Sequence, residues 1–475
     1  MRQDARTVDA APDAGLEARD AAPLPTDAAP LPTDAAPLPT DAAPLPTDAA
    51  TPDATPGRSW QDVPEGPAVE PREVCSWSAS PLPTLELRMP IHFSRVRVDG
   101  EGNALVAGSI LESRDLGAGM IAVPWTSPKR GTVIAKFDAS CKLLWTKLLP
   151  PRESNNVRDV HTLGFDGDRV VVLTASSTVT NVWRFDAFTS SSLEIAALST
   201  RDGSIVSERA IQVGIKPIDA SADVFDGALH LNVRGTAGLD LGQGPIADDT
   251  RGKYVNAVFS SDGQLQNSEL FGGATGLEAP FTQAFGSAGT LALAGSQIDD
   301  YFGQSLGEPA TLLMLDGLHR LVWKQELTPA AVTNPYVYGT FTLALTQQGS
   351  LAIAENWSNE AYAVARYDVA GKLAFRLPLR ADDNMLASPG VLRAREQSFA
   401  LLGSLYTRTR FGNSWIEPPD AQGGHAYALM LDEVGAVRWA RVFREALLDI
   451  DLTPDDASFV LTESSPALQL RKLAR

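Results

Sequence analysis

Asp138-Ala-Ser-Cys-Lys-Leu-Leu-Trp145 places an aromatic residue seven positions after an Asp, and this arrangement returns along the chain. A strand-like apolar run precedes each Asp, a short turn follows it, and a second strand carries the aromatic. The other copies are Asp316 with Trp323, Asp368 with Phe375, and Asp432 with Trp439. The distances between the Trp residues correspond to units of about 58 residues. A period of this length, built from short strands and turns, predicts a β-propeller.

Further strands complete each unit around this hairpin. Turns such as Asp99-Gly-Glu-Gly-Asn103 separate the apolar runs, and residues of these types favour tight reversals of the chain. The strands expected in the first unit are 92–99, 104–110, 132–138 and 143–149. Similar units follow as far as Phe443, after which three more strands are expected, over 447–452, 458–462 and 467–473.

The last unit therefore lacks a fourth strand, and residues 83–89 are a candidate for it. This segment, Pro-Thr-Leu-Glu-Leu-Arg-Met, alternates like a strand but precedes the first unit. As the outer edge of the last blade, it would close the ring and remove the free ends of an open array. We predict an all-β, seven-bladed β-propeller over residues 75–475. Six or eight blades are alternatives, because loop lengths blur the unit boundaries.

Residues 1–74 differ in composition from the rest of the chain. Residues 20–47 are four copies of Asp-Ala-Ala-Pro-Leu-Pro-Thr. Dense proline removes backbone donors and favours extended polyproline II, and the periodic aspartates repel one another. We therefore predict a disordered, acidic tether that reaches on the order of 150 Å. A sequence relic without a role is the alternative.

Composition and missing motifs exclude several classes of function. The net charge is −18, half of it in the tail, so we expect no nucleic-acid partner. No run of apolar residues is long enough to span a membrane. The histidines lack metal-ligand spacing, and no nucleophile elbow, phosphate loop or dinucleotide fingerprint occurs. We predict no catalytic residues, no metal site and no cofactor, and we expect a monomer.

A second pattern supports the alignment of the units. Gly108-Ser109 is followed by Leu116-Gly117, and Gly403-Ser404 is followed by Phe411-Gly412. Together with the Asp–Trp hairpins, this pattern resembles the bacterial β-propeller repeat of large surface proteins and lipoproteins. The resemblance covers nearly all of residues 75–475. It implies a propeller fold and an exported setting, and that family has no shared catalytic residues.

The Trp hairpins also resemble those of propellers with pyrroloquinoline-quinone-type repeats. That group includes quinone-dependent dehydrogenases and cofactor-free assembly scaffolds. The usual Thr-Gly pair of its turn is absent here.

The tail has a resemblance of its own, to the Pro/Ala/Asp spacers that follow the lipidated cysteine of many bacterial surface lipoproteins. No such cysteine precedes Met1-Arg2-Gln3-Asp4. The natural start lies further upstream, or a leader has been removed, or the protein is intracellular. We favour an exported protein at the cell surface or in the periplasm, with an outer-membrane lipid anchor upstream of Met1 as one option.

The long loops between second and third strands are the best candidates for a binding surface. In a propeller these loops emerge on one face, and aromatic side chains there suit the recognition of proteins or sugars. The candidate binding residues are Trp125, Trp183, Tyr301, Trp357, Tyr406 and Trp415. The hairpin aromatics, by contrast, are expected to pack between neighbouring blades.

Cys75 and Cys141 are the only two cysteines. Cys75 precedes the expected closing strand, and Cys141 lies in the hairpin turn of the first blade. A disulfide between them would fasten the ring closure, and it would require an oxidising compartment. We predict this bond as one of two options, the other being two free thiols.

Three functions remain open from the sequence. The first is a non-catalytic binding or scaffold propeller, displayed outside the cytoplasm on its tether. The second is an enzyme in the central funnel, a lyase, a glycosidase or a quinone-dependent dehydrogenase. It would need a polar cluster there, with groups such as Arg95, His161 or Asp219. The third is a purely structural component of the envelope. A fold of this kind does not choose among them.

Overall fold

The chain divides into two units, residues 1–56 and residues 57–475. In this computed structural model, every named element of the described residues is a β-strand. The disorder predicted for the tail concerns mainly residues outside the described ranges and stays a prediction. The structure describes residues 61, 64–79, 91–117, 119–125, 129–151, 157–179, 188–212, 220–234, 239–242, 244, 254–271, 282–286, 289–295, 310–317, 320–327, 339–357, 361–381, 388–420, 424–464 and 467–475.

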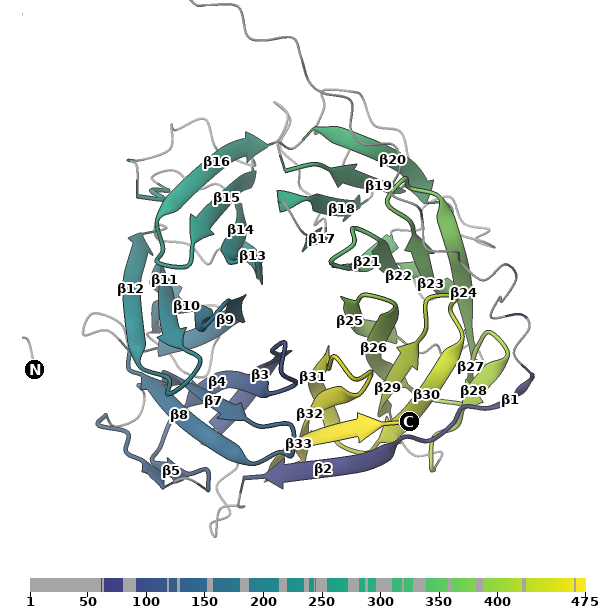
Figure 1. The fold of residues 1–475 in the computed structure, drawn as a ribbon, viewed down its shortest axis with the longest axis horizontal. Coiled ribbons are helices and arrows are strands. Elements are labelled where there is room, and N and C mark those ends of the chain that lie inside the picture. The colour runs from purple at the N-terminus through teal and green to yellow at the C-terminus, as the bar shows by residue number, and fades with distance from the viewer. Residues whose placement is uncertain are drawn as a thin grey trace, which may run out of the picture. The chain divides into compact units, whose positions relative to one another are not determined.

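In the described part of the unit 57–475, seven antiparallel blades of four strands surround a common centre (Figure 1), which confirms the predicted propeller fold. From the innermost strand outward, the first four blades are blade 1 with β3 (Ile91–Val98), β4 (Ala104–Ile110), β7 (Gly131–Phe137) and β8 (Leu143–Leu149); blade 2 with β9 (Val157–Asp166), β10 (Arg169–Val179), β11 (Phe188–Ser199) and β12 (Ile205–Gln212); blade 3 with β13 (Ala220–Phe225), β14 (Ala228–Arg234), β15 (Tyr254–Ser260) and β16 (Leu265–Phe271); and blade 4 with β17 (Thr282–Phe285), β18 (Leu291–Gly295), β19 (Ala310–Leu315) and β20 (Leu321–Leu327).

The remaining three blades complete the ring. They are blade 5 with β21 (Gly339–Leu345), β22 (Leu351–Trp357), β23 (Ala361–Tyr367) and β24 (Leu373–Ala381); blade 6 with β25 (Ser388–Arg395), β26 (Ser398–Leu405), β29 (His425–Leu431) and β30 (Val437–Phe443); and blade 7 with β31 (Ala446–Leu452), β32 (Ser458–Ser464), β33 (Ala467–Ala474) and β2 (Arg72–Ser78). Three short strands extend the sheet of blade 5 outward, namely β27 (Thr409–Phe411), β28 (Ser414–Ile416) and β1 (Gly66–Pro67). A separate two-stranded sheet consists of β5 (Arg114–Asp115) and β6 (Met120–Ile121).

The hydrophobic core lies between the blades. The middle strands are buried on both faces, so β4 and β7 are continuous apolar runs rather than alternating ones. Buried side chains of neighbouring blades interlock in clusters, for example Val106 of blade 1 with Leu461 of blade 7. Each blade therefore depends on both of its neighbours for the burial of its faces.

An N-terminal strand closes the ring as predicted, but it is not the predicted segment. Strand β2 pairs antiparallel with β33 and forms the outer edge of blade 7. The assignment of residues 83–89 to this place is therefore wrong, and that segment itself lies outside the described residues. Alternation favoured residues 83–89, whereas β2 is held in place by β33 and by a disulfide. The boundary predicted at residue 75 falls inside β2, so the propeller begins earlier.

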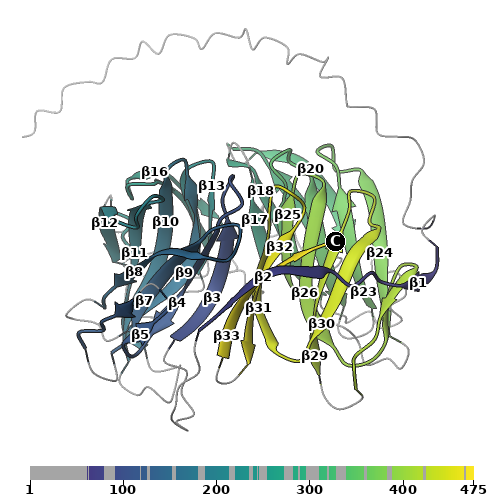
Figure 2. The same cartoon turned by 60° about the horizontal axis from the view of Figure 1, so that its bottom comes forward.

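The chain before β2 links the outer edges of three blades (Figure 2). Strand β1 pairs parallel with β28 beside blade 5. The carbonyl of Val69 then accepts a hydrogen bond of 3.0 Å from the N–H of Ala440 in blade 6. Glu73 of β2 forms an ion pair of 3.5 Å with Arg441 of the same blade, while β2 itself pairs with blade 7. We call residues 64–78 the strap.

Each recurring Asp shapes the turn between the third and fourth strands of its blade. The Oδ1 atom of Asp138 accepts hydrogen bonds of 2.9 Å from the backbone N–H groups of Ser140 and Lys142. Asp368 and Asp432 accept equivalent bonds from the residues two and four positions later. A carboxylate that binds successive N–H groups stabilises a tight reversal without help from the rest of the fold.

The aromatic residue of one blade packs on the turn glycine of the next blade. Trp145 of blade 1 donates its Nε1–H to the carbonyl of Thr200 in blade 2 at 3.0 Å. A Cβ atom on Gly203 of that turn would lie 2.7 Å from the Trp145 ring, so only glycine fits there. The same 2.7 Å distance separates two further pairs, Trp323 from a Cβ on Gly371 and Phe375 from a Cβ on Gly435. These hairpin aromatics are therefore structural, as expected.

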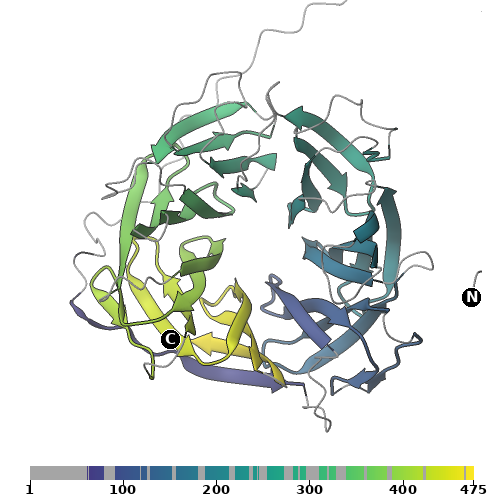
Figure 3. The same cartoon turned by 180° about the vertical axis from the view of Figure 1, so that it is seen from behind.

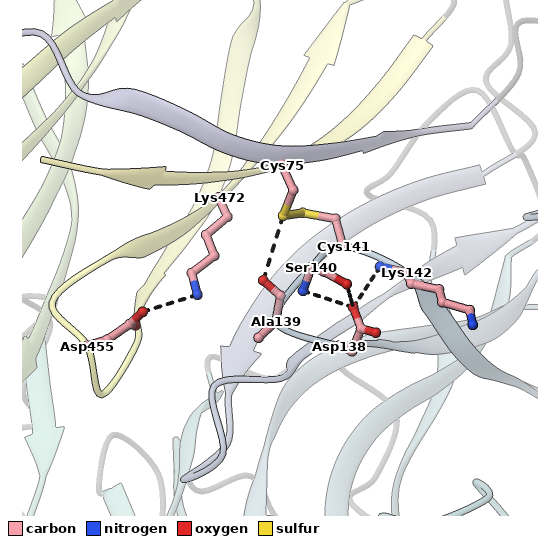
Figure 4. The surroundings of a disulfide bond; sticks show 8 residues. All are labelled: Cys75, Asp138, Ala139, Ser140, Cys141, Lys142, Asp455 and Lys472. Carbon is pink, nitrogen blue, oxygen red and sulfur yellow. Dashed lines mark hydrogen bonds and ion pairs between the residues drawn. A yellow bond between two sulfur atoms is a disulfide. The ribbon is translucent and has the colours of Figure 1, made fainter.

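A disulfide joins Cys75 of β2 to Cys141 in the first turn of blade 1, as Figure 4 shows, with the Cα atoms 5.8 Å apart. Trp77 supports it, because its Nε1–H donates to the carbonyl of Leu116 at 3.1 Å and its ring lies 4.9 Å from that of Phe137. The last blade is thus tied to the first at the rim.

The disulfide occupies the position of the aromatic–glycine contact. Cys75 opposes Lys472 beside a register shift in blade 7, just as Trp145 opposes Lys136 beside a register shift in blade 1. Cys141 is the third residue after its turn Asp, the position that Gly371 holds in blade 5. Its φ of 63° is one that glycine adopts freely and other residues rarely do. Blades 7 and 1 are neighbours in the ring but not in the sequence. Between them, the covalent bond replaces the packing contact.

This equivalence predicts that an aromatic–glycine pair can replace the disulfide in part. The bond closes a loop with a sequence separation of 66, which corresponds to about 4 kcal/mol at most. We expect Cys75→Trp with Cys141→Gly to unfold at a higher guanidinium concentration than Cys75→Ala with Cys141→Gly, because a buried Trp restores roughly 1–3 kcal/mol. Unfolding followed by circular dichroism measures both midpoints. Equal midpoints would contradict the equivalence.

A second prediction concerns the turn glycines. Gly371 and Gly349 have similar φ values, 77° and 81°, but only Gly371 lies under a Trp ring. Alanine at either site costs about 1–2 kcal/mol for the left-handed conformation. We expect Gly371→Ala to cost a further 1–3 kcal/mol or so, because its methyl group collides with Trp323. Denaturant unfolding of the two variants tests this, and equal losses would argue against a tight contact between blades 4 and 5.

Candidate functional site

The innermost strands of the blades surround a central cavity of about 490 Å³, and they are visible around the centre from either side (Figures 1 and 3). The wall of this cavity is divided. Most of its charged residues come from blades 1, 6 and 7, whereas blades 3, 4 and 5 contribute mainly apolar residues, with Asp223, Gln283 and Thr342 among them. The sequence prediction placed binding on the loops and did not predict this division of the wall.

Asp449 on β31 is the centre of the charged wall and is only 1% exposed. Its Oδ2 atom accepts a bond of 3.1 Å from Arg97 of blade 1, and its Oδ1 atom accepts one of 2.9 Å from Arg393 of blade 6. The two oxygens also accept the backbone N–H groups of Val96 and Ile450. A carboxylate has about four acceptor sites, so this one is fully used inside the fold.

Asp451 repeats this arrangement two residues later. Its Oδ2 atom accepts the N–H of Val98 at 2.7 Å, and its Oδ1 atom accepts its neighbour's N–H, that of Leu452, at 2.9 Å. The N–H groups of Val96 and Val98 lie on the free edge of β3, and the two Asp side chains of blade 7 satisfy them. Burial raises the pKa of Asp451, while nearby Arg97 acts in the opposite direction. We call the Asp449 and Asp451 contacts to β3 the inner seam.

The arginines of the charged wall are in different electrostatic states. Burial alone would lower the pKa of Arg97, but Asp449 and Asp223 outweigh it, so this pKa is raised. The pKa of Arg95 is lowered, first by burial, with Asp449 opposing the shift and Arg97 adding to it. The charge of Arg95 is thus the less well compensated of the two.

Arg95 makes no ion pair within the part of the chain that the structure describes. Its Nε–H donates to the carbonyl of His161 at 3.1 Å, and its Nη1 donates to the carbonyl of Ser94 at 2.8 Å. Both acceptors are neutral backbone groups. The guanidinium therefore keeps donor capacity toward the cavity, because five N–H groups are available to it.

A second cavity of about 470 Å³ lies at the end of blade 6 that carries its long loop and its connection to blade 7. Tyr406 lines it with a ring that is 44% exposed and rests over Gly424. Arg444 reaches Asp420 at 3.3 Å, and the other oxygen of Asp420 lies 3.0 Å from Nε2 of buried His425. An exposed aromatic ring beside a guanidinium and glycine backbone suits a ligand with a flat apolar face and polar edges.

The structure does not gather into one patch the three predicted aromatics whose side chains it describes. Tyr406 lines the second cavity. Trp415 lies on β28 at the outer edge of blade 5, with the Cζ atoms of Arg408 and Arg410 at 4.5 and 6.0 Å from its ring centroid. Trp125 is half-buried in blade 1, and its ring lies against Gly131. These three residues therefore belong to three separate surroundings.

The other three candidates are less informative. Trp357 is the last residue of β22 and opposes Gly339 and Ala361 in the sheet. Trp183 and Tyr301 lie outside the described residues. A binding role for all six aromatics stays a prediction.

The sequence prediction missed the charged wall, apart from Arg95 and His161, although the sequence contains a signal for it. Alternate residues of a strand lie on one face. Three innermost strands carry like charges at alternate positions, namely Arg95-Val-Arg97, Arg393-Ala-Arg395 and Asp449-Ile-Asp451. Opposite charges on neighbouring inner strands predict contact at the centre of a ring. The third group named for the funnel, Asp219, lies outside the described residues.

Within the described ranges, no group of three or more His, Cys, Asp or Glu side chains is arranged to hold a metal ion. No helix in the same ranges has the length and apolar character needed to cross a membrane.

Comparison with known proteins shows similarity in structure only. No family model matches the sequence, and no curated protein matches it. The WD40 domain of SCAP from fission yeast is similar with a TM-score of 0.39 and 11% identity, covering 83% of this chain and 97% of that one. A Bacteroides caccae protein of unknown function has a TM-score of 0.34 and 13% identity, over 64% of this chain and 93% of its own.

The acylaminoacyl peptidase of Pyrococcus horikoshii has a TM-score of 0.43 and 11% identity, over 80% of this chain. The match covers 51% of the peptidase, so this chain corresponds to about half of that protein. Similarities at this level carry no argument about function.

The inner seam predicts that removing the charge of one carboxylate strongly destabilises the fold. Asp449→Asn leaves Arg97 and Arg393 without their shared carboxylate, and we expect the free energy of unfolding to fall by about 3–5 kcal/mol. Asp223→Asn is the matched control, because Asp223 faces the same cavity but its side chain is 41% exposed and 4.0 Å from Arg97. The control should cost less than about 1 kcal/mol. Denaturant unfolding measures both, and similar small losses would show that Asp449 does not hold the blades together.

Proposed function

We propose that this chain is a non-catalytic binding or scaffold β-propeller that recognises a protein or a glycan through its loop face. The observation that supports this most directly is the cavity beside Tyr406 on that face. It combines an exposed aromatic ring with the guanidinium of Arg444, a pairing that is enriched where proteins bind partners. Rigid blades position these side chains, so little ordering is needed when a ligand arrives.

Display outside the cytoplasm is part of this proposal. The Cys75–Cys141 disulfide supports it, because structural disulfides persist in oxidising compartments. The acidic repeats of the tail fit the same setting as a spacer, as in the bacterial surface propellers and lipoproteins that the sequence resembles. A protein with both features would present its loop face at a distance from its attachment point.

An enzyme in the central funnel is the alternative, and the geometry of the charged wall favours binding over it. The oxygens of Asp449 and Asp451 accept backbone N–H groups, and those of Asp449 also accept arginines. A general acid or base needs an oxygen that can reach the substrate. These two carboxylates are instead used to join blades.

The test compares the full-length chain with loop-face variants. Tyr406→Ala with Arg444→Ala should weaken binding to a retained ligand by tenfold or more, about 1.4 kcal/mol, because both side chains line the cavity. The ligand is sought on a glycan array and by capture from an envelope extract with mass spectrometry.

Gln397→Ala is the matched control, since this exposed residue lies in the turn at the opposite end of the same blade. Loss of a ligand with the double variant and retention with the control is the expected result. Equal retention by both variants would rule out the loop face, and no retained ligand at all would favour a structural or catalytic role.

A further inference from the structure

The central cavity has the composition of a small-molecule site, independently of the loop face. Its volume of about 490 Å³ lies within the range of ligand pockets. Apolar residues contribute to one side of it, including the half-buried Val224 and Phe225. Such sites combine apolar walls with a few polar groups that orient the ligand.

The polar groups of this cavity select the sign of the ligand's charge. Arg95, Arg97 and Arg393 face it, opposed by Asp223, Asp449 and Asp451. The paired carboxylates are already bonded, and Asp223 accepts the N–H of Val224 and lies at 4.0 Å from Arg97. Among the three guanidinium groups, Arg95 is the one that forms no ion pair in the described residues, and backbone carbonyls accept its hydrogen bonds. A cation would meet the charge of Arg95, while the oxygens of Asp449 are already bonded.

We propose that the central cavity binds a small aliphatic monocarboxylate, with its carboxylate on Arg95 and its hydrocarbon chain against the apolar wall. A guanidinium and a carboxylate form charge-assisted hydrogen bonds that neutral ligands cannot match. Burial lowers the pKa of Arg95, so a ligand carboxylate there compensates a charge that the fold has desolvated. The apolar wall accounts for a preference for longer chains over acetate.

The experiment titrates the full-length chain with hexanoate, hexanamide and acetate by isothermal calorimetry. We expect hexanoate to bind, and hexanamide and acetate to bind at least tenfold more weakly, because one lacks the charge and the other lacks the chain. Equal affinity for hexanoate and hexanamide, or no heat of binding with hexanoate, would overturn the proposal. This comparison needs no variant and does not depend on the loop face.

Variants then locate the site. Arg95→Gln should weaken hexanoate binding by tenfold or more, and Arg95→Lys should retain part of it because the charge remains. Arg320→Gln is the matched control, since that side chain is 73% exposed and pairs with Asp316 in a turn of blade 4. Unchanged binding in a folded Arg95→Gln protein, checked by circular dichroism, would place hexanoate elsewhere and refute the site. Unchanged affinity in Tyr406→Ala separates this cavity from the loop face.

Discussion

Three interfaces between consecutive blades are built on an aromatic ring that lies on a turn glycine of the next blade, at Trp145 on Gly203, Trp323 on Gly371 and Phe375 on Gly435. In the turns of blades 5 and 6 a recurring Asp binds the backbone N–H groups, the glycine leaves its backbone uncovered, and the ring of the preceding blade covers it. A ring that can approach only a glycine also fixes the spacing between blades, since a single methyl group would separate them.

Such contacts run from one blade to its successor, so the last interface must be made by the two ends of the chain. Two sets of bonds join blades 7 and 1, at different radii. The disulfide replaces the ring-on-glycine contact at the rim, while the strap that carries Cys75 also bonds blades 5, 6 and 7 from outside. At the centre, Asp449 and Asp451 accept the edge N–H groups of β3. This interface thus adds a covalent bond and buried ionic contacts to the apolar packing that it shares with the other interfaces.

Much of this architecture could be predicted from local patterns. Strands β4 and β8 were predicted with their observed bounds, since turn residues on both sides delimit them. The identity of the closing strand was not predicted, because β2 is selected by its partners, Cys141 and β33, rather than by alternation. To predict the charged wall, one must know which innermost strands lie side by side. The strands of blades 1 and 7 become neighbours only when the ring closes. Tyr406 was predicted from loop position, but its cavity also needs Arg444 from the connection to blade 7.

Closure and binding compete for the same side chains at the centre. Asp449 can join blades 6, 7 and 1 only by using both of its oxygens, which removes it from any chemistry in the cavity. Arg95 has no share in this carboxylate and donates its hydrogen bonds to neutral backbone carbonyls of blades 1 and 2 instead. Burying the guanidinium of Arg95 without an ion pair costs stability, and the proposed carboxylate ligand would offset that cost.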